Sequence, residues 1–179
     1  MPTRFTRSKF SLIDLVTDHY KTLRNYSTGR ASVGDYMIYV AVPAACGILV
    51  AVLGARADNL PEVLSAAAIL TGLIFNSYVL LFDLTMRVSD RTDPARMGEV
   101  MRVAGELRAN ISYAVLVGIV LTTGLGGVVM LSDYNELPIP ITVSVVFLAA
   151  QLLLTIFMIL KRIRALYRAF LVAAPAPVP

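Results

Sequence analysis

Four apolar runs, each long enough to cross a membrane, constrain this sequence more than any other feature. They extend over about residues 36–55, 60–85, 112–131 and 139–160, and a helix needs about 20 apolar residues to cross roughly 30 Å of hydrocarbon. Backbone groups in lipid must be hydrogen-bonded within the protein, which favours helices. The sequence therefore predicts an all-α polytopic membrane protein with four transmembrane helices arranged as two hairpins.

The basic residues lie almost entirely on one side of these spans. Of the 16 Lys and Arg residues, only Arg56 falls in a loop on the other side. Cytoplasmic segments of membrane proteins carry an excess of Lys and Arg. Both termini and the loop between the second and third runs are therefore predicted to be cytoplasmic, with the protein in a bacterial inner membrane. This basic side would face anionic lipids, and nucleic acid is not expected as a partner.

The predicted topology divides the chain into three parts. Residues 1–35 form a cytoplasmic N-terminal segment with an amphipathic interfacial helix. Residues 36–171 form the four-helix transmembrane domain with a cytoplasmic helical loop at 87–111, and residues 172–179 form a disordered tail of Pro and Ala. Little chain remains for a separate soluble domain of 50 residues or more.

Residues that usually carry catalysis or bind metals are scarce. The chain has one cysteine, Cys46, and one histidine, His19. Neither a disulfide nor a metal site follows from single residues of these types, and no acidic residue lies near the middle of a span. We therefore predict no catalytic residue, no metal and no cofactor, and we do not expect an enzyme.

A short amphipathic helix is predicted between residue 11 and about residue 25. Ser11 precedes Asp14 by three residues, a spacing typical of a helix start. Apolar residues then recur at helical spacing: Ile13, Val16, Tyr20 and Leu23. Two placements fit this pattern. The helix either lies on the inner membrane surface, with Lys21 and Arg24 reaching lipid phosphates, or packs on cytoplasmic loops of its own chain.

A second helix is predicted in the loop between the second and third spans. Asp93 and Pro94 suit an N-cap and a first helical position, and the helix would continue into the third span. Its apolar stripe consists of Met97, Val100, Met101, Ala104 and Leu107. This stripe needs a partner, which the N-terminal helix, another copy of the chain or a cytoplasmic protein could supply.

Polar residues within the spans are the strongest functional clue. The second-span stripe consists of Ser65, Gly72, Asn76 and Asp83, and the fourth-span stripe of Ser144, Gln151, Thr155 and Arg162. Both have steps of 7, 4 and 7, which place the residues on one helical face. Such residues either hydrogen-bond between helices or line a path for ions or water. Asp83 and Arg162 have opposite charge and could pair.

Two other groups of residues have predicted contacts. Rows of small residues on the first and third spans should let helices approach closely: Gly47, Ala51 and Ala55, then Gly118, Thr122 and Gly126. Basic residues at the predicted cytoplasmic end should contact lipid head groups: Lys21, Arg24, Lys161, Arg164 and Arg168.

Four short groups of residues serve for comparison with known proteins: Asp35 and Tyr36 with Pro43, residues 68–76 with Leu81, Asp83 and Leu84, residues 110–114, and residues 160–162 with Ala165 and Leu166. Together they resemble landmarks of a loose group of small bacterial and prophage membrane proteins with four spans. The overall plan is also similar to that of prophage exclusion proteins of the Rex type, proposed to depolarise the membrane during infection. This likeness implies no site residues.

Two hypotheses of function follow. In the first, the chain forms a homo-oligomer that acts as a small channel or membrane-perturbing effector, in phage defence or superinfection exclusion. Several copies are expected because side chains fill the centre of a single four-helix bundle. In the alternative, it is a membrane scaffold or regulatory subunit that docks a cytoplasmic partner. A transporter or lipid-active enzyme is disfavoured because the sequence shows no coupling carboxylate.

Overall fold

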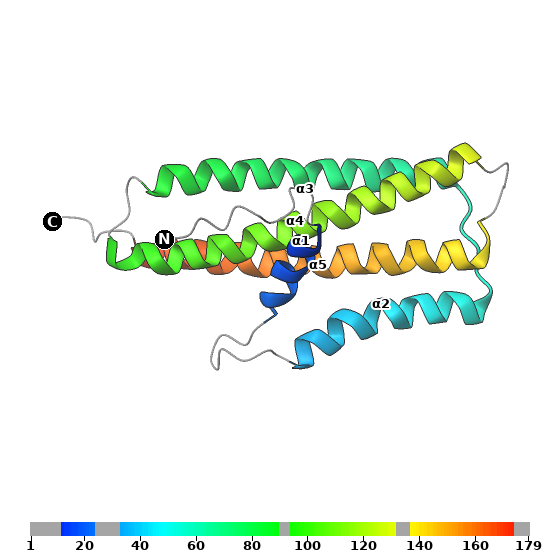
Figure 1. Ribbon diagram of the computed structural model, residues 1–179, viewed down its shortest axis with the longest axis horizontal. Helices are drawn as coiled ribbons and strands as arrows, with labels where there is room; N and C mark the ends of the chain where they lie inside the picture. The colour runs from blue at the N-terminus through cyan, green and yellow to red at the C-terminus, as the bar shows by residue number, and fades with distance from the viewer. Residues whose placement is uncertain (1–11, 24–32, 90–93, 132–136, 174–179) are drawn as a thin grey trace, which may run out of the picture.

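The computed structural model describes residues 12–23, 33–89, 94–131 and 137–173, and these residues form five helices (Figure 1). The helices are α1 (Leu12–Lys21), α2 (Val33–Leu53), α3 (Leu60–Ser89), α4 (Pro94–Leu131) and α5 (Ile139–Ala173). Four of them are long and apolar enough to span a membrane, over Tyr36–Leu53, Leu60–Asp83, Met101–Leu131 and Ile139–Arg168. The all-α fold with four long apolar helices is confirmed.

The four long helices are arranged side by side in the order α3, α4, α5, α2 (Figure 1). Helix α4 packs on α3 and α5, and α2 packs on α5, whereas α2 and α3 share no contact in the described part of the chain. The helices of the first hairpin therefore lie at opposite edges. The loop that joins them is held by α5 and the residues just before it. The Leu137 N–H donates to the Ala57 carbonyl at 2.9 Å, and the Ala57 N–H donates to Thr142 Oγ1 of α5 at 3.3 Å.

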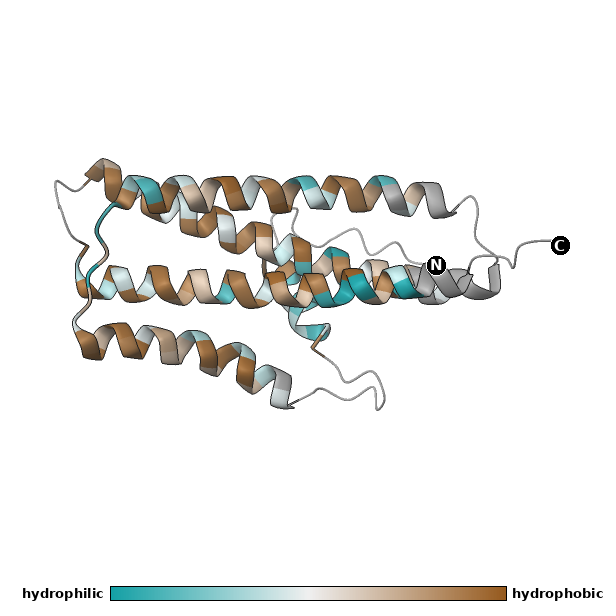
Figure 2. Ribbon diagram, turned by 180° about the vertical axis from the view of Figure 1, so that it is seen from behind, coloured by the Kyte–Doolittle hydropathy of each residue, from teal (hydrophilic) through white to brown (hydrophobic). Residues whose placement is uncertain are grey.

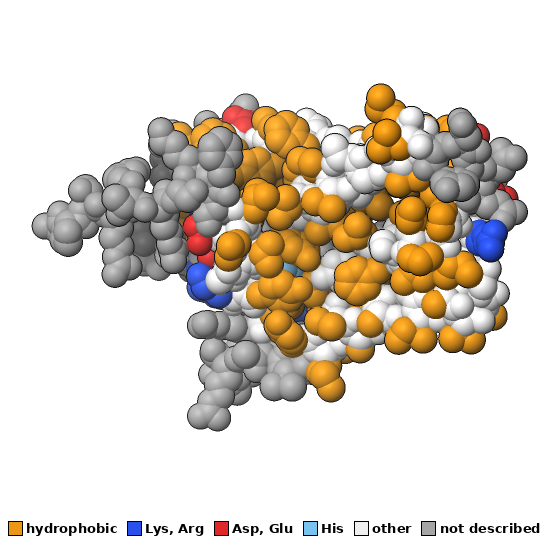
Figure 3. Space-filling view, turned by 45° about the vertical axis from the view of Figure 1, so that its right-hand side comes forward, with side chains coloured by type: hydrophobic (Ala, Val, Ile, Leu, Met, Phe, Trp, Pro, Cys, Tyr) orange, Lys and Arg blue, Asp and Glu red, His pale blue; other side chains and the backbone are white. Residues whose placement is uncertain are grey.

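Apolar side chains cover the outside of this array. Figure 2 shows hydrophobic residues along all four long helices, and Figure 3 shows hydrophobic side chains over the middle of one face, with charged side chains towards its ends. Large residues such as Val52, Met130 and Leu131 are strongly exposed. Exposure of so much apolar surface to water would be unfavourable. The helix lengths and this surface together define a multi-pass membrane protein in contact with the lipid bilayer.

Helix α4 runs without a break from the loop after α3 through the third span, as predicted. Its apolar stripe is partly covered by the chain itself, since Ala104 and Leu107 are buried and Leu23, just after α1, belongs to the same hydrophobic cluster as Leu107. The side chains of Met97 and Val100 lie outside the described part. Helix α1 therefore supplies a partner for this stripe.

The two edge helices contact the central pair through glycines. A Cβ at Gly118 of α4 would overlap the Oγ1 of Thr71 on α3, and a Cβ at Gly47 of α2 would lie 3.2 Å from Val143 Cγ1 on α5. Pro43, which lies four residues before Gly47 on α2, is also fully buried. These glycines let the helices approach closely.

Candidate functional site

The two polar stripes occupy different environments although their spacing is identical. On α5, Gln151, Thr155 and Arg162 are buried and Ser144 is exposed. On α3, all members of the second-span stripe are exposed: Ser65, Gly72, Asn76 and Asp83. The difference arises because α5 packs on two long helices, whereas α3 packs on α4 alone among the described residues.

The second-span stripe lies on the side of α3 opposite α4. Asn76 is two positions from buried Ile74, and Asp83 is two positions from buried Leu81. Two residues turn a helix by about 200°. The stripe therefore faces away from the subunit that the structure describes.

The middle of the fourth-span stripe is hydrogen-bonded to α2 and α4. Thr155 Oγ1 donates to the Gln151 carbonyl at 2.8 Å, so the Tyr39 hydroxyl donates to Thr155 at 2.5 Å. The Gln151 Nε2 donates to the Tyr113 hydroxyl at 3.3 Å. Gln151 and Thr155 therefore connect helices within one subunit.

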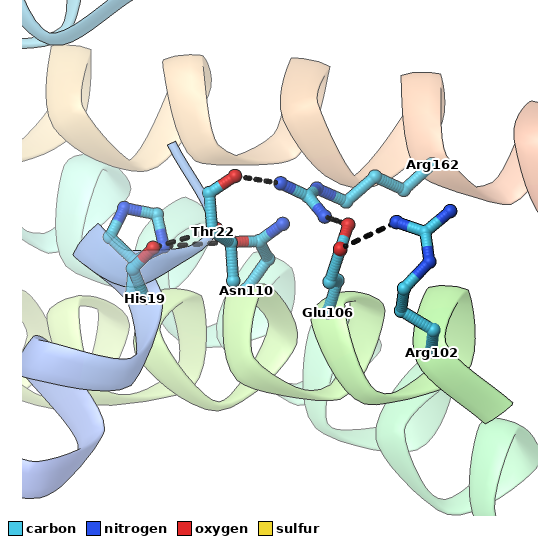
Figure 4. Close-up of polar contacts among 6 residues, drawn as sticks. All are labelled: His19, Thr22, Arg102, Glu106, Asn110 and Arg162. Carbon is cyan, nitrogen blue, oxygen red and sulfur yellow. Dashed lines mark hydrogen bonds and ion pairs between the residues drawn. The ribbon is translucent and has the colours of Figure 1, made fainter. Parts of the chain in front are cut away.

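A buried polar network at one end of the spans fixes α1 on α4 (Figure 4). His19 and Asn110 are fully buried. The His19 Nδ1–H donates to Asn110 Oδ1 at 2.9 Å, and the Thr22 hydroxyl lies 3.0 Å from the same oxygen and 2.6 Å from the His19 carbonyl. Asn110 of α4 thus contacts the polar side chains of both His19, in α1, and Thr22, just after it.

Arg162 joins α5 to the same network (Figure 4). Its guanidinium donates to the Thr22 carbonyl at 2.7 Å and pairs with Glu106, which also pairs with Arg102 at 3.1 Å. The Thr22 carbonyl lies at the C-terminal end of α1, where carbonyl groups lack partners within the helix and favour a nearby cation. Arg162 therefore caps α1 while its charge is balanced by Glu106.

Aromatic rings fill the space around α1. The His19 ring stacks on Tyr113 with a centroid distance of 4.0 Å and an interplanar angle of 9°. The Tyr20 ring lies 5.4 Å from Tyr36 and 5.9 Å from Tyr39, both on α2, and burial raises the pKa of Tyr20 to about 12. Helix α1 therefore contacts rings from both α2 and α4.

Three buried polar atoms of this region have no hydrogen-bond partner among the described residues: His19 Nε2, Asn110 Nδ2 and Gln151 Oε1. Buried polar groups are usually paired. Their presence in one connected region indicates that the network has hydrogen-bonding capacity that the described side chains do not use.

The remaining predicted residues have mixed placements. Gly47 and Gly118 lie in helix contacts, whereas Ala51 and Ala55 are exposed; Thr122 and Gly126 are half-buried. Lys161, Arg164 and Arg168 are exposed, Lys21 pairs with Asp18 at 3.0 Å, and Arg24 lies outside the described residues. Their contact with lipid head groups stays a prediction.

An apolar groove opens between α3 and α4 at the same end of the array as α1. Its volume is about 310 Å³. The residues that line this α3–α4 groove are Tyr78, Leu81, Phe82, Thr85, Met86, Met101, Ala104, Gly105 and Arg108. The groove is distinct from the network around α1 because Arg108 and Asn110 lie about 200° apart on α4.

Sequence reasoning did not anticipate the α1 network. Arg162 pairs with Glu106 on α4, not with the Asp83 partner proposed for it, and α3 and α5 share no contact in the described part. His19 and Asn110 are 91 residues apart. Two features of the sequence could have indicated a polar network: the amide of Asn110 at the start of the third span, and the spacing of four residues between Arg102 and Glu106. Neither of them indicates His19 as a partner.

No metal site is seen in the part of the chain that the structure describes, since no three His, Cys, Asp or Glu side chains come together there. No protein-family model, curated protein or solved structure matches this chain. The fold and its surface define the class as a four-span integral membrane protein.

Proposed function

We propose that the chain assembles into a homo-oligomer through the second-span stripe and acts as a small channel or membrane-perturbing effector. The observation that carries this proposal is the position of Asn76, exposed in an apolar span on the side of α3 opposite α4. A carboxamide facing hydrocarbon costs free energy, and such groups pair with polar groups of neighbouring helices. The same stripe of a second copy offers those groups.

A closed ring of copies would bring several second-span stripes to a common axis. Side-chain hydroxyls and amides along such an axis can replace part of an ion's hydration shell. The fourth-span stripe is less suited to this role, because Gln151 and Thr155 already bind partners within the subunit. The resemblance to prophage proteins with four spans leads us to place this activity in phage defence or superinfection exclusion.

The test is to replace Asn76 with Leu. We expect the oligomer in nanodiscs to dissociate and the membrane depolarisation caused by expression to fall at least about fivefold, because the interfacial hydrogen bonds, roughly 0.6 to 2 kcal/mol each, are lost in every subunit. Native mass spectrometry and a potential-sensitive dye measure the two effects.

Ser77→Leu is the matched control, since Ser77 is exposed on α3 but lies about 100° from Asn76. It should leave both readouts unchanged. Depolarisation by well-inserted Asn76→Leu at the wild-type level would contradict the proposal, as would a monomeric wild-type protein.

A regulatory membrane subunit is the second candidate, and the α3–α4 groove favours it. Phe82 and Met86 are exposed there, and Arg108 makes no ion pair with any described residue. The groove would suit an amphipathic segment of a cytoplasmic protein with an acidic residue facing Arg108.

Filling the groove tests this second candidate. A Cβ at Gly105 meets nothing within 4 Å, so Gly105→Leu should occupy the groove without disturbing the fold. A photoreactive residue placed at Phe82 should then cross-link a bound partner at least about tenfold less efficiently. Gly124→Leu, at an open position further along α4, should leave it unchanged. Equal cross-linking in both variants would exclude the groove as the docking site.

A further inference from the structure

We propose that α1 is a latch that stays docked on α4 and α5 while His19 is neutral and is released when His19 takes up a proton. The α1 latch is the segment 12–23, and its docking surface includes Asn110 and Arg162 (Figure 4). The Tyr113 ring of α4 and the Tyr39 ring of α2 complete this surface. This inference concerns regulation and does not depend on the proposed channel or effector activity.

Polar contacts contribute much of the docking. The apolar residues at the start of α1 are not packed, with Ile13 76% exposed and Leu12 56% exposed. The docking contacts are the His19 and Thr22 bonds to Asn110 and the Arg162 bond to the Thr22 carbonyl, together with ring contacts and the packing of Val16, Tyr20 and Leu23. Because a buried polar group that loses its partner costs free energy, loss of one of these polar contacts should weaken the docking of α1.

The hydrogen bonds define which form of His19 fits this site. Because Asn110 Oδ1 can only accept, the Nδ1 of His19 carries the proton and Nε2 is an acceptor. Nε2 is buried and has no partner among the described residues. A second proton would place an N–H donor and a positive charge at a buried position where no described residue is a hydrogen-bond partner, which is unfavourable.

The groups around His19 do not offset that charge. They are Tyr20 on α1, Tyr39 on α2, Glu106 and Tyr113 on α4, and Arg162 on α5. Arg162 repels a second cation, and Glu106 already pairs with Arg162 and Arg102. Asp18 and Lys21 pair with each other and are both more than half exposed. The nearest fixed charge therefore opposes protonation.

Burial, followed by repulsion from Arg162, lowers the pKa of docked His19 from 6.5 to about 4, although the bond to Asn110 partly opposes this. Released His19 should titrate near 6.5. The docked state thus binds fewer protons, so docking is strongest above pH 6.5 and weakens as the pH falls towards 4. The docking equilibrium should fall about 30-fold by about pH 5.

The experiment measures the distance between α1 and α5 in the full chain. Spin labels are attached at Thr17→Cys and Lys161→Cys, both exposed, in a Cys46→Ala background diluted with unlabelled chain in nanodiscs. Pulsed electron paramagnetic resonance should give one narrow distance near pH 7.5 and a second, longer distance near pH 5. The reference pair Ser77→Cys and Lys161→Cys, between α3 and α5, should not change.

Two variants test whether His19 is the group whose protonation releases α1. His19→Asn keeps an N–H donor for Asn110 but cannot titrate, so it should retain the neutral-pH distance near pH 5. If His19→Asn does not dock at neutral pH, Asn110→Asp gives an independent answer, because a carboxylate would stabilise protonated His19 and keep α1 docked in acid. A wild-type distance that is the same at both pH values would overturn the proposal. Acid release that persists in a docked His19→Asn variant would also overturn it, because a group other than His19 would then be responsible. Because the readout is the position of α1, it is separate from any loss of depolarisation.

Discussion

Replacing Arg162 with Leu should detach α1 and destabilise the contact between α4 and α5. The Arg162 side chain is only 8% exposed and connects α1, α4 and α5 through Thr22 and Glu106. Its removal leaves the Thr22 carbonyl without this donor and removes one of the cations that pair with Glu106, the other being Arg102. Removing one partner of a buried ion pair costs about 3–5 kcal/mol, and access of water to Glu106 and Arg102 should reduce this to about 2 kcal/mol.

Unfolding by SDS in mixed micelles measures this change in free energy. Arg164→Leu is the matched control, because Arg164 is exposed on the same helix, and it should change the free energy of unfolding by less than about 0.5 kcal/mol. The double variant Arg162→Leu with Glu106→Leu should be less destabilised than the sum of the single variants, since both members of the Arg162–Glu106 pair are then removed and Arg102 is half exposed to water. Equal effects of Arg162→Leu and Arg164→Leu would show that the network contributes no stability.

The long helices could be predicted because hydropathy is a local property of the sequence. Each span needs only a sufficient run of apolar residues, and all four expected runs are long apolar helices. The continuation of α4 from Pro94 into the third span could be predicted for the same reason. Helical periodicity depends on neighbouring residues alone, so it does not require knowledge of the packing.

The environments of the two polar stripes could not be predicted in this way. Asn76 is the third residue of one stripe and Gln151 the second residue of the other, and the two stripes have identical spacing, yet Asn76 is exposed and Gln151 is buried. Spacing shows which residues share a face, but burial depends on how many helices pack there. That number follows from the order α3, α4, α5, α2, which is a tertiary property.

The placement of α1 also could not be predicted from local sequence patterns. Periodicity grouped Ile13 with Leu23 on one face, but Ile13 is exposed and Leu23 is buried. His19, which has no obvious partner in the sequence, is fully buried because Asn110 and Tyr113 are brought beside it by α4. Contacts between residues so far apart in the chain require the fold to be known.

The position of α3 should depend strongly on Gly118, and Gly118→Leu is expected to separate α3 from α4. A Cβ at this position would overlap Thr71 Oγ1 and lie 2.8 Å from Thr71 Cγ2. Thr71 cannot easily turn away, because its hydroxyl bonds the Ala67 carbonyl at 2.7 Å and β-branched side chains are stiff in helices. Overpacking of this kind costs about 1–3 kcal/mol or more, and α3 has no other helix contact in the described residues.

Gly124→Leu separates this steric effect from the general effect of replacing a glycine in α4, because a Cβ at Gly124 meets nothing within 4 Å. It should leave the SDS unfolding transition unchanged or slightly raised, whereas Gly118→Leu should lower it. Gly118→Ala should be rescued by Thr71→Ala, which removes the two overlapping atoms. Failure of this rescue would mean that the contact does not position α3. If the contact does position it, Gly118→Leu should also reduce oligomer formation, because the second-span stripe would no longer be held on the outer side of the array.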